Sequence, residues 1–154
     1  MTFAGIAQIK SSLPPGHRLL GLDVGTKTIG LAISDPRLTI ATPLETIRRK
    51  RFTDDLATLA RIVGERRIGG LVIGLPISMD GSEGPRCQSV RQFAANVLEK
   101  LDVPIAFWDE RLSTAAVTRM MIDEADLSRR RRGEVVDKLA AAYILQGALD
   151  YAGG

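Results

Sequence analysis

The chain has 154 residues, of which 45% are hydrophobic and 25% charged, and its formal net charge is +3. This length and composition are typical of one globular domain with a substantial core. The single cysteine excludes an internal disulfide and a zinc site built from several thiolates, and the single histidine gives a Ser-His-Asp triad little support.

Residues 1–17 are predicted to form a flexible extension, because they run into a stretch rich in serine, proline and glycine. Phe3, Ile6 and Ile9 could nevertheless form one amphipathic turn that docks on the domain. The segment lacks the pattern of a signal peptide, and no run in the chain reaches the roughly 20 apolar residues of a membrane helix. We therefore expect a cytoplasmic protein, without membrane association, whose domain covers residues 18–152.

Apolar runs predict strands at about residues 18–24 and 29–35, joined by a tight turn, and a third strand near 43–47. Further along, the pattern predicts a helix capped by Thr53, a strand at 71–74, a loop from Gly74 to Pro85, a helix at 86–101, a strand at 104–109, a helix capped by Ser113 and a last helix at 134–151. Strands joined by short turns pair antiparallel, whereas strands separated by helices pair parallel. We therefore predict one α/β domain with a mixed sheet and helices on both faces.

Asp23 is the most informative residue, because it lies in the middle of the apolar run 19–25, which is predicted to be a buried strand. Burying even a neutral polar group without a partner costs about 2–7 kcal/mol, so a carboxylate here requires compensation. Acids recur in apolar settings at Asp109 and Glu110, which end a predicted strand, and at Asp137, near the start of the last helix. We interpret these three places as one metal-binding carboxylate cluster.

Each acid also has a structural explanation. Asp23 could cap the turn that follows it, Asp109 or Glu110 could form an ion pair at a strand end, and Asp137 could stabilise the start of a helix. Small and apolar residues follow Asp137 at helical spacing, so its carboxylate lies on a helix face that can approach the sheet. Successive residues of a strand point to opposite faces, so the spacing does not choose between Asp109 and Glu110.

The chemistry that such a cluster supports is phosphodiester hydrolysis. Carboxylate oxygens are the ligands that Mg²⁺ and Mn²⁺ prefer. Two such ions about 3.5–4 Å apart can activate a water and stabilise the leaving oxygen of a phosphodiester. The sequence therefore predicts Mg²⁺ or Mn²⁺ as cofactor and a nucleic acid as substrate.

Clustered positive charge favours the same class of substrate. The pI is about 9.3, and about half of the lysines and arginines fall at 48–51, 61–67 and 129–132. This distribution favours a polyanionic partner over solvated basic loops. Candidate phosphate contacts, chosen by charge and position alone, are Lys27, Arg86, Arg111, Arg129, Arg130, Arg131 and Arg132.

The loop from Gly74 to Pro85 is a further candidate element. It follows a central parallel strand, and ligands tend to bind at the carboxyl ends of such strands. We expect this loop to lie near the acids and to be mobile without substrate.

Four segments resemble the YqgF family, also called RuvX, of the RNase H-like superfamily. They are 20–32 (LGLDVGTKTIGLA), 72–76 (VIGLP) with Gly81, 109–114 (DERLST) and 137–141 (DKLAA), and together they span about residues 18–149. The resemblance implies an RNase H-like fold with a five-stranded mixed sheet whose first three strands are antiparallel. It implies catalytic, metal-binding acids at Asp23, Glu110 and Asp137, and it prefers Glu110 over Asp109. Asp23 would then bridge two ions, and the other two acids would each hold one.

The resemblance also implies a function. It is that of a bacterial cytoplasmic nuclease that matures the 5′ end of pre-16S ribosomal RNA, with ribosome association as one expected form of contact with this substrate. Members have also been proposed as resolvases of Holliday junctions, and the residues do not distinguish RNA from branched DNA. The oligomeric state, monomer or weak homodimer, is equally open.

Two other functions fit parts of the sequence. Asp-x-Gly-Thr followed by an apolar strand also resembles the first phosphate motif of sugar kinases and actin-like ATPases, but those proteins use two such domains and this chain has room for one. A nucleic-acid-binding module without catalysis would need only the basic clusters. With 5% aromatic residues, such a module would not bind bases by stacking on its sheet.

Overall fold

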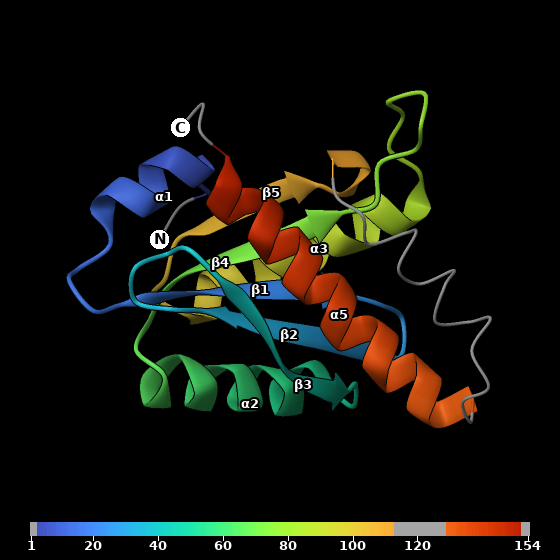
Figure 1. Ribbon diagram of the computed structural model, residues 1–154. Helices are drawn as coiled ribbons and strands as arrows, with labels where there is room; N and C mark the ends of the chain where they lie inside the picture. Colours follow the sequence, from blue (N-terminus) through green and yellow to red (C-terminus); the bar gives the residue numbers. More distant parts are fainter. Residues whose placement is uncertain (1–2, 113–128, 152–154) are drawn as a thin grey trace.

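The computed structural model describes residues 3–112 and 129–151, without the side chains of 129–135 (Figure 1). Its elements in chain order are α1 (Ile6–Ser12), β1 (Arg18–Val24), β2 (Thr28–Ser34), β3 (Ala41–Arg48), α2 (Phe52–Glu65), β4 (Ile68–Leu75), α3 (Pro85–Lys100), β5 (Ile105–Asp109), the short 3-10 helix η1 (Glu110–Leu112) and α5 (Arg129–Asp150). None of the helices described is long and apolar enough to cross a membrane.

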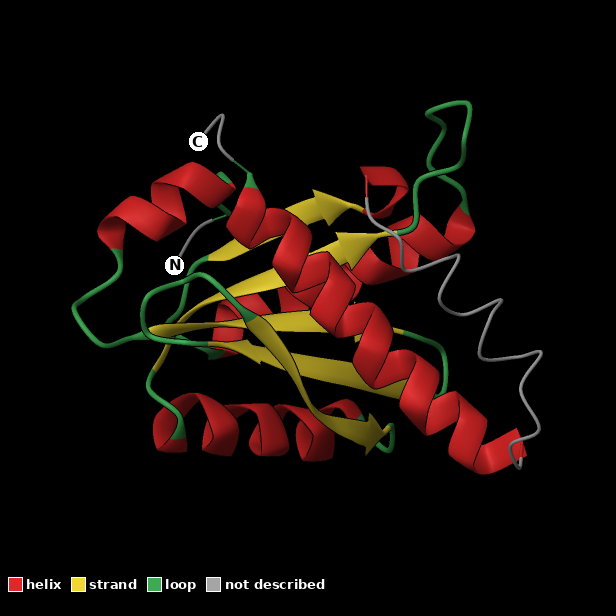
Figure 2. Ribbon diagram, in the orientation of Figure 1, coloured by secondary structure: helices red, strands yellow, loops and turns green. Residues whose placement is uncertain are grey.

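The five strands form one mixed sheet in the order β3-β2-β1-β4-β5 (Figure 2). β1 and β2 pair antiparallel, as do β2 and β3, whereas β4 pairs parallel with both β1 and β5. The predicted mixed α/β sheet with helices on both faces is therefore confirmed. The carboxyl ends of β1, β4 and β5 point in the same direction, toward the end of the molecule where α5 begins (Figure 1).

Helices cover the sheet on both faces. On one face, α2 and α3 pack through large residues such as Leu59, Ile62 and Phe93 against alternate residues of the strands. On the other face, α5 and α1 pack over a second apolar cluster that includes Ile9 and Ile144. We call these the α2/α3 face and the α5 face.

The described part of the N-terminal segment is folded onto the α5 face. Ile6 and Ile9 are buried, and Lys10 Nζ donates a hydrogen bond to the carbonyl oxygen of Leu149 at 2.9 Å. A Cβ on Gly70 would lie 2.7 Å from Ile9 Cγ2, so α1 sits directly on a glycine of β4. The amphipathic turn suggested by the sequence is therefore a docked helix, and the segment expected to be a flexible extension packs on the domain. The predicted bounds of the domain, residues 18–152, stay a prediction.

Two helix boundaries differ from the sequence prediction. Helix α2 begins after Arg51, so Thr53 is inside the helix and does not cap it. The side chain of Asp55 accepts a hydrogen bond from the Lys50 amide at 3.0 Å, which ties the incoming chain to the first turn. The last helix begins at Arg129, before the expected residue 134. The helix expected to begin at Ser113 lies outside the described residues.

Candidate active site

Asp23 lies on the α5 face of β1, one residue before that strand ends. The residue is 3% exposed. Gly21, two residues earlier, faces α5, because a Cβ there would lie 2.7 Å from Leu145 Cβ. Residues two apart in a strand share a face, so Asp23 also points toward α5. The predicted burial of this carboxylate is confirmed.

Asp137 is brought to Asp23 by a glycine on the neighbouring strand. Gly30 of β2 is the register partner of Asp23. A Cβ on Gly30 would overlap the backbone carbonyl of Asp137, so the backbone of α5 lies directly on the sheet at this point. The Asp137 carboxylate accepts a hydrogen bond from the Thr28 hydroxyl. Asp137 is therefore held over the strand next to Asp23.

Glu110 approaches Asp23 from the other side, again over a glycine. Leu22 pairs with Ile73, so Gly74 lies beside Asp23 on β4. A Cβ on Gly74 would lie 3.0 Å from Glu110 Cγ. The three neighbouring positions Gly30, Asp23 and Gly74 therefore form a short row across the sheet, with Asp137 over one end and Glu110 over the other.

The register of β5 separates Glu110 from Asp109. Phe107 packs on the α2/α3 face and Trp108 on the α5 face. Because side chains alternate between faces, Asp109 lies on the α2/α3 face and Glu110 on the α5 face. Asp109 forms an ion pair with Arg111, with Oδ2 2.6 Å from Nη2, and hydrogen bonds from this guanidinium hold the pKa of Asp109 below its usual range. Glu110 therefore shares the α5 face with Asp23, whereas Asp109 does not; that Glu110 is the catalytic acid stays a prediction.

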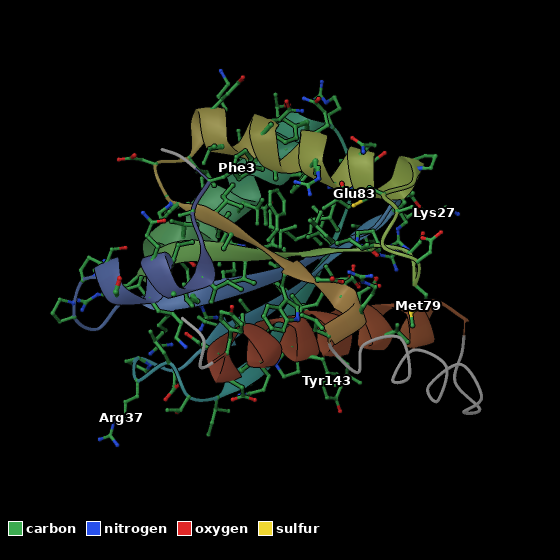
Figure 3. All side chains as sticks on the ribbon, turned by 90° about the horizontal axis from the view of Figure 1, so that it is seen from above. Phe3, Lys27, Arg37, Met79, Glu83 and Tyr143 are labelled. Carbon is green, nitrogen blue, oxygen red and sulfur yellow. The ribbon has the colours of Figure 1, made fainter. Side chains whose placement is uncertain are left out.

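The predicted phosphate contacts differ in their exposure and in whether an ion pair holds them. Lys27 is exposed on the β1–β2 turn, at the same end of the molecule as Met79 and Glu83 (Figure 3). Arg86 is exposed at the start of α3. Arg111 is occupied by its ion pair with Asp109, which reduces its availability to a phosphate. The side chains of Arg129, Arg130, Arg131 and Arg132 lie outside the described part of α5.

The loop at 76–84 lies at this end of the sheet, as predicted. A Cβ on Gly81 would lie 3.6 Å from Nη1 of Arg111, the residue after Glu110. Gly81 has a φ of 89°, a conformation that favours glycine, and its amide donates to the Ser78 carbonyl at 2.8 Å. The loop is therefore a closed turn beside η1, and its mobility stays a prediction.

The three acids supply the donor atoms of a hard-cation site. They contribute carboxylate oxygens, the ligands that Mg²⁺ and Mn²⁺ take, around the buried Asp23. Among the described residues, no group of three or more His, Cys, Asp or Glu is arranged to hold a metal ion as it stands. The residues fit the ion in donor type and location.

Comparison with known proteins identifies the family. A profile of RuvX, described as Holliday junction resolvase, matches residues 17–151. The chain belongs to the RuvX family. A RuvX relative from Paramagnetospirillum magneticum is 63% identical over 148 residues, covering 96% of this chain and 95% of its own. Another from Roseobacter denitrificans is 59% identical over 152 residues, covering 97% of this chain and 93% of its own. Both carry the name of a candidate pre-16S rRNA nuclease.

Solved structures agree with the fold. Thermus thermophilus RuvC in complex with a Holliday junction substrate aligns to this RuvX chain with a TM-score of 0.55 at 16% identity, covering 90% of this chain and 96% of RuvC. Another structure of the same RuvC gives a TM-score of 0.54 at 14% identity, covering 88% of this chain and 96% of RuvC. The predicted family and RNase H-like fold are confirmed.

Sequence reasoning missed the residues that position the acids. Gly30 and Gly74 sit inside apolar strands, where glycine costs stability and often marks the close approach of another backbone. That signal was present in the sequence of this RuvX chain. Its meaning required the strand register, which places both glycines beside Asp23.

Proposed function

We propose that this protein is a Mg²⁺- or Mn²⁺-dependent nuclease that matures the 5′ end of pre-16S ribosomal RNA by hydrolysing phosphodiester bonds. The observation that carries the proposal is the row of Gly30, Asp23 and Gly74, over which Asp137 and Glu110 converge. The names of the RuvX relatives support the choice of RNA. A substrate of this kind would place the protein in the cytoplasm, in contact with ribosomal precursors.

The proposed roles follow from position. Asp23, Glu110 and Asp137 would hold the ions, with the buried Asp23 at the centre of the three positions. The divalent ions would supply Lewis-acid stabilisation of the scissile phosphate. Thr28 orients the Asp137 carboxylate through its hydroxyl. Exposed Lys27 would hold the phosphate backbone beside this site.

The test is cleavage of a structured RNA that carries the 5′ precursor segment of 16S rRNA, in Mn²⁺ and in Mg²⁺. Asp23→Asn should lower the rate by about 10³-fold, because the neutral amide is a poor ligand for a hard cation. Asp35→Asn is the matched control, since Asp35 lies in the β2–β3 turn and binds Thr39 and Ile40. Equal rates for wild type and Asp23→Asn would remove Asp23 from the mechanism. RNA binding in EDTA, with no cleavage in any metal, would instead favour a binding module without catalysis.

A second candidate is cleavage of branched DNA, which the description of the matched family favours. The same carboxylates would serve, because both substrates present phosphodiesters to the same ions. A synthetic four-way DNA junction and the precursor RNA should be offered at equal concentration. Faster cleavage of the RNA supports the first proposal, and faster symmetrical cleavage of the junction supports the second.

A further inference from the structure

A pocket of about 330 Å³ lies at the same end of the sheet as the acids, but on the α2/α3 face. Its lining residues are Val24, Gly25, Thr26, Arg49, Pro85, Arg86, Ser89 and Val90. They come from the end of β1, the turn after it, the segment after β3 and the first turns of α3. Its volume lies within the range of about 300–1,000 Å³ typical of ligand sites.

The pocket lining is mostly apolar and carries positive charge. Val24, Pro85 and Val90 provide the apolar surface, and Thr26 and Ser89 add hydroxyl groups. The guanidinium groups of Arg49 and Arg86 are the charged groups that line it. An apolar lining beside positive charge suits a flat, uncharged ring that carries a phosphate.

Arg49 fixes the shape of this pocket. Its Nη1 donates to the Gly25 carbonyl at 2.6 Å, and its guanidinium lies 5.2 Å from the centre of the Phe93 ring on α3. One side chain thus ties the β1–β2 turn to the helix on the other side of the pocket. A pocket that is formed in advance binds more tightly, because less ordering is needed on binding.

Arg86 remains available to an anion. Within the described residues it forms no ion pair, and it is exposed at the start of α3. That helix has no acidic residue in its first turn and no side-chain cap, so its positive dipole end adds to the charge of Arg86. Glu83, the acid nearest in sequence, is bound by Arg91 at 2.6 Å.

We propose that this pocket binds the base of one unpaired nucleotide of the RNA substrate, with its phosphate on Arg86. The inference rests on the proposed nuclease function. Val24 directly follows Asp23 in β1, and the two side chains point to opposite faces. A single strand that crosses this end of the sheet would therefore place one base in the pocket while an adjacent phosphate reaches the acids. The pocket thereby selects precursor RNA that is single-stranded next to the cleavage site.

The first test is NMR of the whole protein with adenosine 5′-monophosphate, and with ribose 5-phosphate as the probe that lacks a base. The nucleotide should shift the amide signals of Thr26, Ser89 and Val90 saturably, at about 10-fold lower concentration than ribose 5-phosphate. Ser89 is exposed on α3 and lines the pocket, so the large side chain in Ser89→Trp should fill the pocket and abolish these shifts. Gln92 is exposed on the same helix but does not line the pocket, so Gln92→Trp should keep them. Equal potency of the two probes, or shifts that persist in Ser89→Trp, would overturn the proposal.

The second test separates this inference from the nuclease function. Binding of a hairpin RNA with and without a short single-stranded tail is measured in EDTA, where no metal-dependent cleavage occurs. The tail should raise the affinity of wild type and Gln92→Trp by about 10-fold, and that of Ser89→Trp by less than 2-fold. An equal gain in affinity in all three proteins would refute base binding in the pocket, whatever the cleavage assay gives. If wild type cleaves no RNA when metal is present, the nuclease proposal is refuted, and the comparison of binding affinities in EDTA still tests the pocket.

Discussion

The strands present large aliphatic side chains such as Leu22, Leu31 and Ile73 to α2 and α3, whereas toward α5 they present Gly30, Gly74 and the buried Asp23. Large side chains bury the most apolar surface and so stabilise the fold. Glycines let the backbone of α5 lie against the strands, which brings acids from distant parts of the chain together. Both faces bury apolar residues, but only the α5 face combines them with the glycines and the buried carboxylate that set the geometry of the site.

The largest expected effect separates the faces at one strand end. Glu110→Gln, on the α5 face, should lower the cleavage rate by about 10³-fold, because it removes a proposed metal ligand. Asp109→Asn, on the opposite face, should change the rate by less than about 5-fold, because Asp109 serves to hold Arg111. The measurement is the single-turnover rate at saturating Mn²⁺. A larger loss in Asp109→Asn than in Glu110→Gln would reverse the assignment.

On the α2/α3 face, the expected effect is on stability. Leu59 of α2 is fully buried in that cluster, so Leu59→Ala should lower the free energy of unfolding by about 2–5 kcal/mol. The cleavage rate of the folded variant should stay close to that of wild type. Ile40→Ala, at a position 62% exposed, is the control and should cost less than about 0.5 kcal/mol. Urea unfolding gives both values, and a Leu59→Ala protein that is stable but inactive would contradict the division between the faces.

A single methyl group on the α5 face should affect both the stability and the cleavage rate. Gly30→Ala would place a Cβ against the Asp137 carbonyl, so α5 must move and Asp137 with it. We expect a loss of about 1–3 kcal/mol in stability and a clear loss of cleavage rate. Gly64→Ala on α2 meets nothing within 4 Å and should be neutral or stabilising. Thermal unfolding and the cleavage assay check both variants, and an active Gly30→Ala protein would show that α5 need not lie on β2.

The smallest expected effect lies at the far end of the sheet. Hydrogen bonds from the Ile40 amide and from Thr39 lower the pKa of Asp35 to about 2. Because the folded-state pKa lies below the unfolded one, the ionised side chain stabilises the fold above about pH 4, and this contribution is lost as the pH falls toward 2. The stability difference between wild type and Asp35→Asn should therefore be constant above pH 4 and shrink below it. A difference that grows on acidification, measured by urea unfolding, would contradict this.

Much of the fold could be predicted from sequence, because the patterns that define it are local. The apolar run around Asp23 predicted a buried strand, and the short turns of the first three strands predicted their antiparallel pairing. Helix α1 was not recognised as part of the domain. Its docking depends on contacts with Gly70 and Leu149, which are distant in sequence.

The candidate site was predictable in part for the same reason. Asp23 and Asp137 stood out by their apolar surroundings, and both lie on the α5 face or against it. Spacing alone did not choose between Asp109 and Glu110, because that choice depends on the register of β5; the family resemblance already preferred Glu110. The pocket beside Arg86 was equally hidden, because it is built from three separate segments of the chain.

The convergence of Asp23, Glu110 and Asp137 is tested most directly by soaking Mn²⁺ into crystals of the protein and recording its anomalous scattering. The expected result is a peak bounded by these three carboxylates on the α5 face, lost in crystals of Asp23→Asn. A saturating soak that leaves no peak there, or that places the ion away from Asp23, would contradict the shared metal site.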